Sequence, residues 1–174
     1  LKTRALLVQQ RTQSVNALRA HLAELGIIAA GGLPNIAALM TIVREAEDTR
    51  LPTAARFALT AIVDQIDALA IQIGVLERTI VTASKRDESM RRLTTIPGVG
   101  AITAATIKAV VPDPGGFKSG RHFAAWVGLT PRPHSSGGKE RLGRISKMGN
   151  PELRVLLVLG ATAVLRIARN DEKA

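Results

Sequence analysis

Two serines beside two glycines stand in a strongly basic stretch of the chain, between residues 131 and 150. Ser135 and Ser136 precede the glycines, and one acid, Glu140, lies among four basic residues, which are Lys139, Arg141, Arg144 and Lys147. A serine hydroxyl can attack a phosphodiester, and nearby Lys and Arg stabilise the charge that develops. Ser-Ser-Gly-Gly is also typical of a solvated linker. The residue types alone therefore leave nucleophile and linker as open alternatives.

Other reactive groups are few. His134 adjoins Ser135 and could act as a base, although such a histidine is more often an ordinary loop residue. The chain has no Cys, which excludes thiolate metal sites and disulfides, and no Tyr, which excludes a tyrosyl-phosphate link to DNA. Asp64 and Asp67 lie three residues apart on a predicted helix, where solvated or ion-paired carboxylates are usual. The sequence predicts no metal site.

A second motif reads Ile96-Pro97-Gly98-Val99-Gly100 and is followed by small residues. This pattern resembles a helix-hairpin-helix element. Gly98 and Gly100 would let the backbone approach a phosphate closely, and the following helix would direct its free N–H groups toward it. Such a contact reads the nucleic-acid backbone and not its sequence. The alternative is a tight turn between helices that binds no ligand.

The elements that must position these motifs are helices. Aromatics make up 2% of the chain, so its core must be built from Leu, Ile, Val and Ala, which favours an all-α fold. Helices are predicted from residue 2 to about residue 25, around 36–47, from Ser119 to about Val127, and from Asn150-Pro151-Glu152 to about Arg169, with Ser119 and Asn150 as caps. The first of them is predicted to end near Gly26 or at Gly31-Gly32-Leu33-Pro34. Residues 130–149 are predicted to be a loop. We expect a helical and coiled-coil segment at residues 1–90 and a compact helical domain at residues 91–174.

The clearest periodicity is a heptad seam with alternating spacings of three and four, formed by Leu59, Ile62, Ile66, Leu69, Ile73, Leu76 and Ile80. It predicts either a coiled coil that pairs two copies of the chain or a packing of this helix against the one at residues 2–25. Three heptads are marginal alone, and the first helix carries a matching stripe. Both alternatives stay open.

The net charge of +10 is unevenly distributed. Residues 1–84 carry 8 Lys or Arg and 7 Asp or Glu, a balance of +1, whereas residues 85–174 carry 16 and 7, a balance of +9. This asymmetry indicates a polyanionic partner for the second half, with nucleic acid favoured over mere solubility. No run of about 18 apolar residues predicts a membrane span. Because the chain opens on Leu1-Lys2-Thr3-Arg4 without a helix cap, we expect further chain upstream.

The order of these motifs resembles the C-terminal transposase domain of DEDD-type insertion-sequence recombinases, the class named after insertion sequence one hundred and ten, with the Piv DNA invertases as relatives. The matching stretches are Ile96-Pro97-Gly98-Val99-Gly100, Phe117-Lys-Ser119, Phe123-Ala-Ala-Trp126-Val-Gly128-Leu-Thr-Pro131, Ser136-Gly137 and Gly143-Arg-Ile-Ser-Lys147-Met-Gly-Asn150. Residues 10–19 resemble the family's central helix, so the resemblance covers nearly the whole chain.

The resemblance implies DNA strand exchange with Ser136 as nucleophile, Ser135 and Ser146 being the alternatives. Nucleic acid would contact Gly98, Gly100, Lys139, Arg141, Arg144 and Lys147. It also implies donor and target DNA, a guide RNA, self-association through the heptad helix and a bacterial cytoplasm. A RuvC-like domain with four Mg²⁺-binding acids would lie upstream, so this chain alone should be inactive. Two rival hypotheses are a non-catalytic helix-hairpin-helix module that binds nucleic acid and a coiled-coil scaffold.

Overall fold

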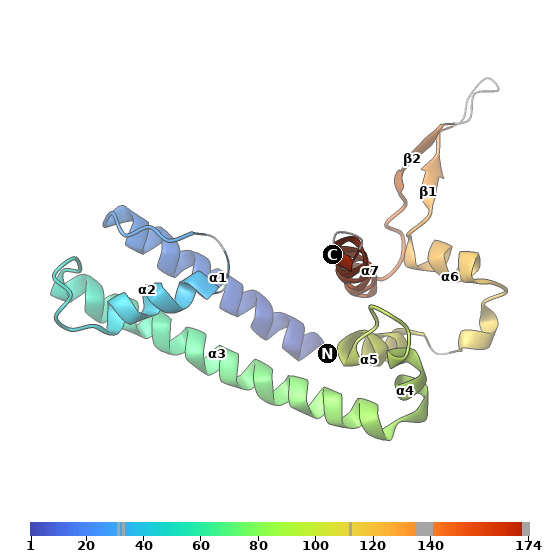
Figure 1. The fold of residues 1–174 in the computed structure, drawn as a ribbon, viewed down its shortest axis with the longest axis horizontal. Helices are drawn as coiled ribbons and strands as arrows, with labels where there is room; N and C mark the ends of the chain where they lie inside the picture. Colours follow the sequence, from blue (N-terminus) through green and yellow to red (C-terminus); the bar gives the residue numbers. More distant parts are fainter. Residues whose placement is uncertain (31, 33, 112, 135–140, 172–174) are drawn as a thin grey trace. The chain divides into compact units, whose positions relative to one another are not determined.

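The computed structural model of the chain describes residues 1–30, 32, 34–111, 113–134 and 141–171 and is mostly helical (Figure 1). The all-α prediction is confirmed, with one small antiparallel hairpin added. Its elements are α1 (Lys2–Glu24), α2 (Pro34–Arg44), α3 (Thr53–Arg86), α4 (Glu88–Thr94), α5 (Ala101–Val110), the 3₁₀ helix η1 (Pro114–Gly116), α6 (Gly120–Val127), β1 (Pro131–Pro133), β2 (Leu142–Ile145) and α7 (Pro151–Asp171).

The chain forms two compact units, unit 1 from Leu1 to Arg78 and unit 2 from Thr79 to Ala174. The division falls inside α3, whereas the sequence analysis places it between residues 90 and 91. The reason is local, because no proline or glycine pair interrupts residues 53–86 and the helix runs on as one piece into unit 2.

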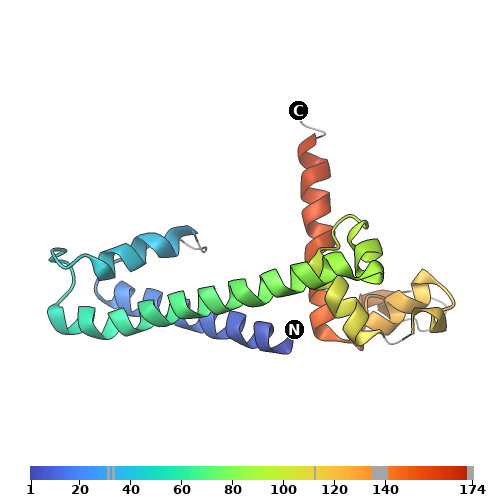
Figure 2. The same ribbon diagram turned by 90° about the horizontal axis from the view of Figure 1, so that it is seen from below.

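Unit 1 is a helical core in which α1 lies alongside α3, as Figures 1 and 2 both show. Its buried cluster draws on three helices through Val15, Leu18, Leu22, Leu39, Val43, Leu59, Val63 and Ile66. Four residues of the predicted seam, Leu59, Ile66, Leu69 and Ile73, are buried within the single chain. The seam therefore serves the core of unit 1, as the second alternative predicts. Pairing of two copies through this helix stays a prediction.

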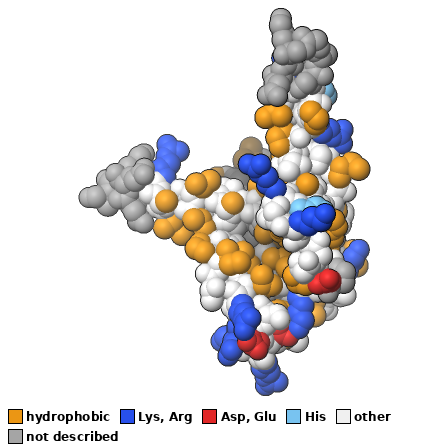
Figure 3. Space-filling view, turned by 90° about the vertical axis from the view of Figure 1, so that its right-hand side faces the viewer, with side chains coloured by type: hydrophobic (Ala, Val, Ile, Leu, Met, Phe, Trp, Pro, Cys, Tyr) orange, Lys and Arg blue, Asp and Glu red, His pale blue; other side chains and the backbone are white. Residues whose placement is uncertain are grey.

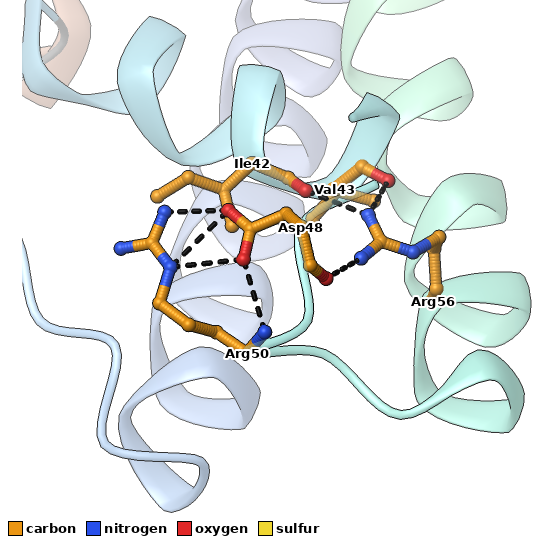
Figure 4. A network of polar contacts seen from close by, with 5 residues as sticks. All are labelled: Ile42, Val43, Asp48, Arg50 and Arg56. Atoms are coloured by element: carbon orange, nitrogen blue, oxygen red, sulfur yellow. Dashed lines mark hydrogen bonds and ion pairs between the residues drawn. The ribbon is translucent and has the colours of Figure 1, made fainter. Parts of the chain in front are cut away.

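The end of α2 is fixed by one arginine from α3 (Figure 4). The Nη1 atom of Arg56 donates to the carbonyl oxygens of Ile42 at 2.8 Å and Val43 at 3.0 Å, and its Nη2 donates to that of Asp48. The last carbonyls of a helix have no partner within it, so this guanidinium caps α2 and ties the following turn to α3. Within the turn, the hydrogen bond from the Arg50 side chain lowers the pKa of the Asp48 carboxyl to about 2.

Helix α3 is long and apolar enough, by length and composition alone, to cross a membrane, with a mean hydropathy of 1.6 over its most apolar window. The sequence prediction counted uninterrupted apolar runs, and this helix has none because polar residues recur along it. Core helices of proteins outside membranes pass the same test, so a single helix of this kind is weak support for a span.

We predict that Arg56→Ala lowers the free energy of unfolding by about 2 kcal/mol, because charged donors to three carbonyls are lost. Arg50→Ala is the matched control, since Arg50 is exposed and forms its ion pair with Asp48, two residues away in the same turn. Its expected cost is under about 0.5 kcal/mol. Urea unfolding followed by circular dichroism measures both. Equal losses for the two variants would contradict the capping role.

Candidate nucleic-acid interface

The basic stretch forms the β1–β2 hairpin, in which Pro131 lies opposite Ile145 and Pro133 opposite Leu142. Proline has no N–H to donate, so the pairing depends on neighbouring residues. The amide of His134 donates to the carbonyl oxygen of Arg141 at 2.7 Å, and that of Ser146 donates to Thr130 at 2.8 Å. These bonds close the hairpin at both ends of the paired region. Residues 134–141, which include Ser135 and Ser136, connect the two strands.

The base of the hairpin is held by two helix ends. Ser119 caps α6 by accepting a hydrogen bond from the amide of His122, and α6 ends at Gly128 in a left-handed conformation. Asn150 caps α7 by accepting from the amide of Leu153. Both predicted caps are confirmed. Arg154 then donates from Nη1 to the carbonyl oxygens of Val127 at 2.9 Å and Gly149 at 3.3 Å, which joins the two helix ends.

The predicted site residues fall into two groups. Ser135, Ser136 and Lys139 lie outside the described residues. Arg141, Arg144, Ser146 and Lys147 lie on the second arm of the hairpin. Ser146 takes part in backbone pairing through its amide, which donates to Thr130, and its carbonyl oxygen accepts a hydrogen bond from Nη2 of the Arg132 side chain at 2.8 Å.

The hairpin contains a groove of about 320 Å³ lined by Arg132, His134, Arg144, Ile145, Ser146 and Lys147. Neither Asp nor Glu occurs among the described residues 129–134 and 141–149. Arg132, Arg144 and Lys147 therefore give the groove a positive potential, which attracts anions. Figure 3 shows basic and hydrophobic side chains side by side on this part of unit 2.

Arg132 is a groove residue that the sequence analysis missed. It lies outside the cluster of cations that follows the serines and enters the groove only because β1 folds back on β2. His134 was singled out for its place beside Ser135, and the structure puts it on the same groove. Two prolines that bracket an arginine are the only sequence signal for β1, and they are also typical of a loop.

Lys147 stands at the end of the hairpin with a φ of 57°, the one positive φ outside glycine in the described part of the chain. Its amide donates to the carbonyl oxygen of Gly128 at 3.0 Å. A left-handed backbone costs an L-residue roughly 1–2 kcal/mol, and such strain is concentrated at functional sites. The surrounding hydrogen bonds hold this lysine in a conformation that glycine would adopt more easily.

The Pro-Gly-Val-Gly segment joins α4 to α5, and its two glycines differ. Gly98 has a φ of 82°, and a Cβ there would lie 2.7 Å from the carbonyl oxygen of Gly160 in α7. Packing of the turn on α7 thus explains Gly98 without a ligand. Gly100 precedes α5, and a Cβ there would meet no atom within 4 Å. A phosphate contact at this turn stays a prediction.

A larger groove of about 880 Å³ lies elsewhere in unit 2, between α4, α5, Phe117 and the start of α6. Phe117 packs edge-on against Phe123 and Trp126, with ring centroids 5.2 and 5.5 Å apart. The cations on this groove are paired, Lys108 with Asp87 and Arg92 with Glu88. The Lys108 hydrogen bond lowers the pKa of the Asp87 carboxyl. This groove is therefore a weaker anion site than the hairpin.

Among the residues that the structure describes, no three His, Asp or Glu side chains gather where they could hold a metal ion.

Residues 90–174 match the family described as Transposase IS116/IS110/IS902. The chain is 44% identical over 166 residues to a putative transposase, y4pF/y4sB, of Sinorhizobium fredii, covering 95% of this chain and 42% of that protein. It is 40% identical over 174 residues to a probable family 20 transposase of Pseudomonas aeruginosa, covering 99% and 52%. A pilin gene-inverting protein of Moraxella lacunata is 38% identical over 73 residues, 41% of this chain and 23% of that protein. The chain spans about half the length of the first two relatives.

We predict that Lys147→Gly raises the free energy of unfolding by about 1 kcal/mol relative to Lys147→Ala, because only glycine relieves the left-handed strain. Both variants lose the same charge, so they should lose affinity for a polyanion such as heparin equally. Thermal unfolding and heparin-column retention measure the two properties separately. A Lys147→Ala variant as stable as Lys147→Gly would show that the strain is absent.

Proposed function

The chain belongs to the Transposase IS116/IS110/IS902 family, and from this premise we propose that it holds DNA and supplies a serine nucleophile for strand exchange. Relatives named as transposases and as pilin gene-inverting proteins support a role in transposition or recombination. The observation that carries the finer proposal is the cationic groove on the hairpin whose connecting residues include Ser135 and Ser136.

Ser136 is the proposed nucleophile, with Ser135 and Ser146 as alternatives. Its Oγ would form a bond to phosphorus while the bond from phosphorus to the oxygen of the leaving strand breaks. The serine proton passes to a base or water, and the leaving oxygen takes up a proton. Ser136 follows His134 by two residues, and two extended residues span at most about 7 Å. A phosphate bound in the groove is thus within a short chain length of the serine.

The cations on the hairpin would neutralise the reacting phosphate. Arg144 and Lys147 line the groove. Arg141 is joined to the first strand because its carbonyl oxygen accepts a hydrogen bond from the amide of His134. Charged donors in a fixed arrangement stabilise the negative charge of a phosphoryl transition state. Lys139 is proposed to act with them. Gly98 and Gly100 would hold a nucleic-acid backbone at the turn before α5, where Gly100 leaves the helix N-terminus uncovered.

The whole protein's activity would need more than this chain, whose relatives are about twice as long. We propose that Mg²⁺-binding acids lie in that remaining part and that this chain alone is inactive. Donor DNA, target DNA and a guide RNA are the proposed nucleic-acid partners, in the bacterial cytoplasm.

Self-association is proposed through a second stripe of α3. The buried seam serves unit 1, but a second row of residues on α3 is exposed and consists of Phe57, Ala61, Ala68, Ile71 and Val75, with Asp64 at the position between Ala61 and Ala68. The Phe57 and Ile71 side chains are 83% and 67% exposed. Small residues at Ala61 and Ala68 would allow two such helices to approach closely. The proposed occupant of the stripe is the same stripe of a second copy.

We predict a covalent adduct between Ser136 and DNA in the complete gene product with Mg²⁺, guide RNA and a nicked donor–target substrate that traps intermediates. The adduct should survive denaturant, map to Ser136 by mass spectrometry and disappear in Ser136→Ala. Ser135→Ala and Ser146→Ala are the matched controls and should retain it.

An adduct on Ser135 or Ser146 would correct the residue and keep the mechanism. Recombination without any adduct would rule out serine catalysis. It would favour the first rival, a non-catalytic module that binds nucleic acid. Absence of nucleic-acid binding at physiological salt, with pairing intact, would favour the scaffold.

We predict that Ile71→Asp with Val75→Asp shifts the chain from dimer to monomer in sedimentation-velocity runs, because buried charges in a helix seam have no partner. Gln72→Asp is the control, since Gln72 is exposed on the same helix outside the stripe. The helical circular-dichroism signal should stay unchanged in both variants. A wild-type chain that sediments as a monomer at every concentration would contradict pairing.

A further inference from the structure

The first strand of the hairpin places two donors on the groove, Arg132 and His134, beside Arg144 and Lys147 of the second arm. We propose that Arg132 and His134 complete a seat for a single phosphodiester group of a nucleic-acid strand. This inference rests on the proposed function and assigns it two further contact residues. Neither belongs to the cluster of cations that follows the serines.

Arg132 is held in place by the strand opposite. Its Nη2 donates to the carbonyl oxygen of Ser146 at 2.8 Å. That bond uses one of the five N–H donors of the guanidinium, whose planar fork can present others to two oxygens of a phosphate. Because one edge of the group is already anchored, little rotational freedom remains to be lost when an anion binds. Arg132 therefore suits a phosphate seat better than a freely rotating surface lysine.

The His134 ring lies over Gly143 of the opposite strand, where no side chain takes up the space. A Cβ at Gly143 would lie 2.3 Å from Cδ2 and 2.7 Å from Nε2 of the imidazole, so any other residue there would displace the ring from this position. The amide of His134 is fixed as well, by its bond to the carbonyl oxygen of Arg141. An imidazole offers at least one N–H donor whether it is neutral or protonated. The ring can thus donate to a phosphate oxygen in either state.

The setting favours a nucleic-acid strand over an isolated anion. Leu142 and Met148 lie on the same arm of the hairpin as Arg144 and Lys147 and are 73% and 78% exposed. Apolar side chains beside a row of cations match the sugars and bases that flank a backbone phosphate, whereas free phosphate would leave them in water. Pairing through both strands also makes the donors one rigid set.

Fluorescence anisotropy measures binding of the 174-residue chain to fluorescein-labelled duplex and single-stranded oligonucleotides. The titrations are repeated at NaCl concentrations from about 50 to about 250 mM, which gives the salt slope. Arg132→Ala should weaken binding about tenfold and lower the salt slope by about one. His134→Ala should weaken it about threefold. Arg166→Ala, the matched control, removes an exposed arginine from α7 away from the hairpin and should stay within about twofold of wild type.

Arg132→Gln separates charge from hairpin structure, because it keeps an N–H donor for Ser146 and loses the charge. A salt slope lowered in both Arg132 variants supports the seat. Variants of Arg132 that bind like Arg166→Ala would overturn it, and an unchanged His134→Ala would remove His134 from it. Displacement of the oligonucleotide by inorganic phosphate beyond the effect of chloride at equal ionic strength would identify a free-phosphate site instead. A wild-type chain that binds no oligonucleotide refutes the proposed function itself.

Discussion

The joint that Arg154 makes between α6 and α7 is the contact on which the basic hairpin depends. A two-stranded hairpin is at best marginally stable in water by itself, and this one has seven strand residues, two of them prolines. Arg154 donates to the carbonyl oxygens of Val127 and Gly149, on the two sides of the hairpin's base. The neighbouring Leu153 is fully buried. The two strands of the hairpin therefore begin at a fixed separation beside α6 and α7, which helps to keep the groove residues in place.

The distribution of acids decides which basic surface can bind an anion. Around α4 and α5, Asp87 pairs with Lys108 and Glu88 pairs with Arg92, and both acids also lie at the start of α4. The positive charge of these two cations is therefore balanced within the fold. The described arms of the hairpin carry no acid, so their cations give this surface a positive potential. Positive charge that can attract an anion is thus found on the hairpin, a part of unit 2 that has few backbone hydrogen bonds of its own. A nucleic-acid strand bound there would in turn stabilise the hairpin by linkage.

Local signals explain why much of the fold could be predicted and part of the site could not. The caps at Ser119 and Asn150 and the end of α1 before Gly26 follow from residues within one helical turn, and the structure agrees with all three. The seam of α3 was predicted from spacing, but spacing cannot tell a partner helix in the same chain from one in another. The hairpin was predicted as a loop because Pro131 and Pro133 hide a strand. Arg132 became a groove residue only through that pairing. Gly98 also packs against Gly160 of α7, a contact 62 positions away that no local pattern reveals, whereas its phosphate contact stays a prediction.

The side chains that line the groove are restrained in position as well as positively charged. Lys147 is forced into a left-handed backbone by its bond to Gly128, Arg132 is tethered to Ser146, and His134 occupies space that Gly143 leaves open. Each restraint removes freedom before any ligand arrives, so binding loses less entropy at these side chains. It also fixes the donors relative to one another, as stabilisation of a phosphoryl transition state requires, because donors that must reorganise during the reaction contribute less. Three separate restraints on one short hairpin are hard to explain by solubility, for which mobile surface lysines would serve equally well. They fit a surface that must hold a phosphate in one orientation while a nucleophile nearby in the chain attacks it.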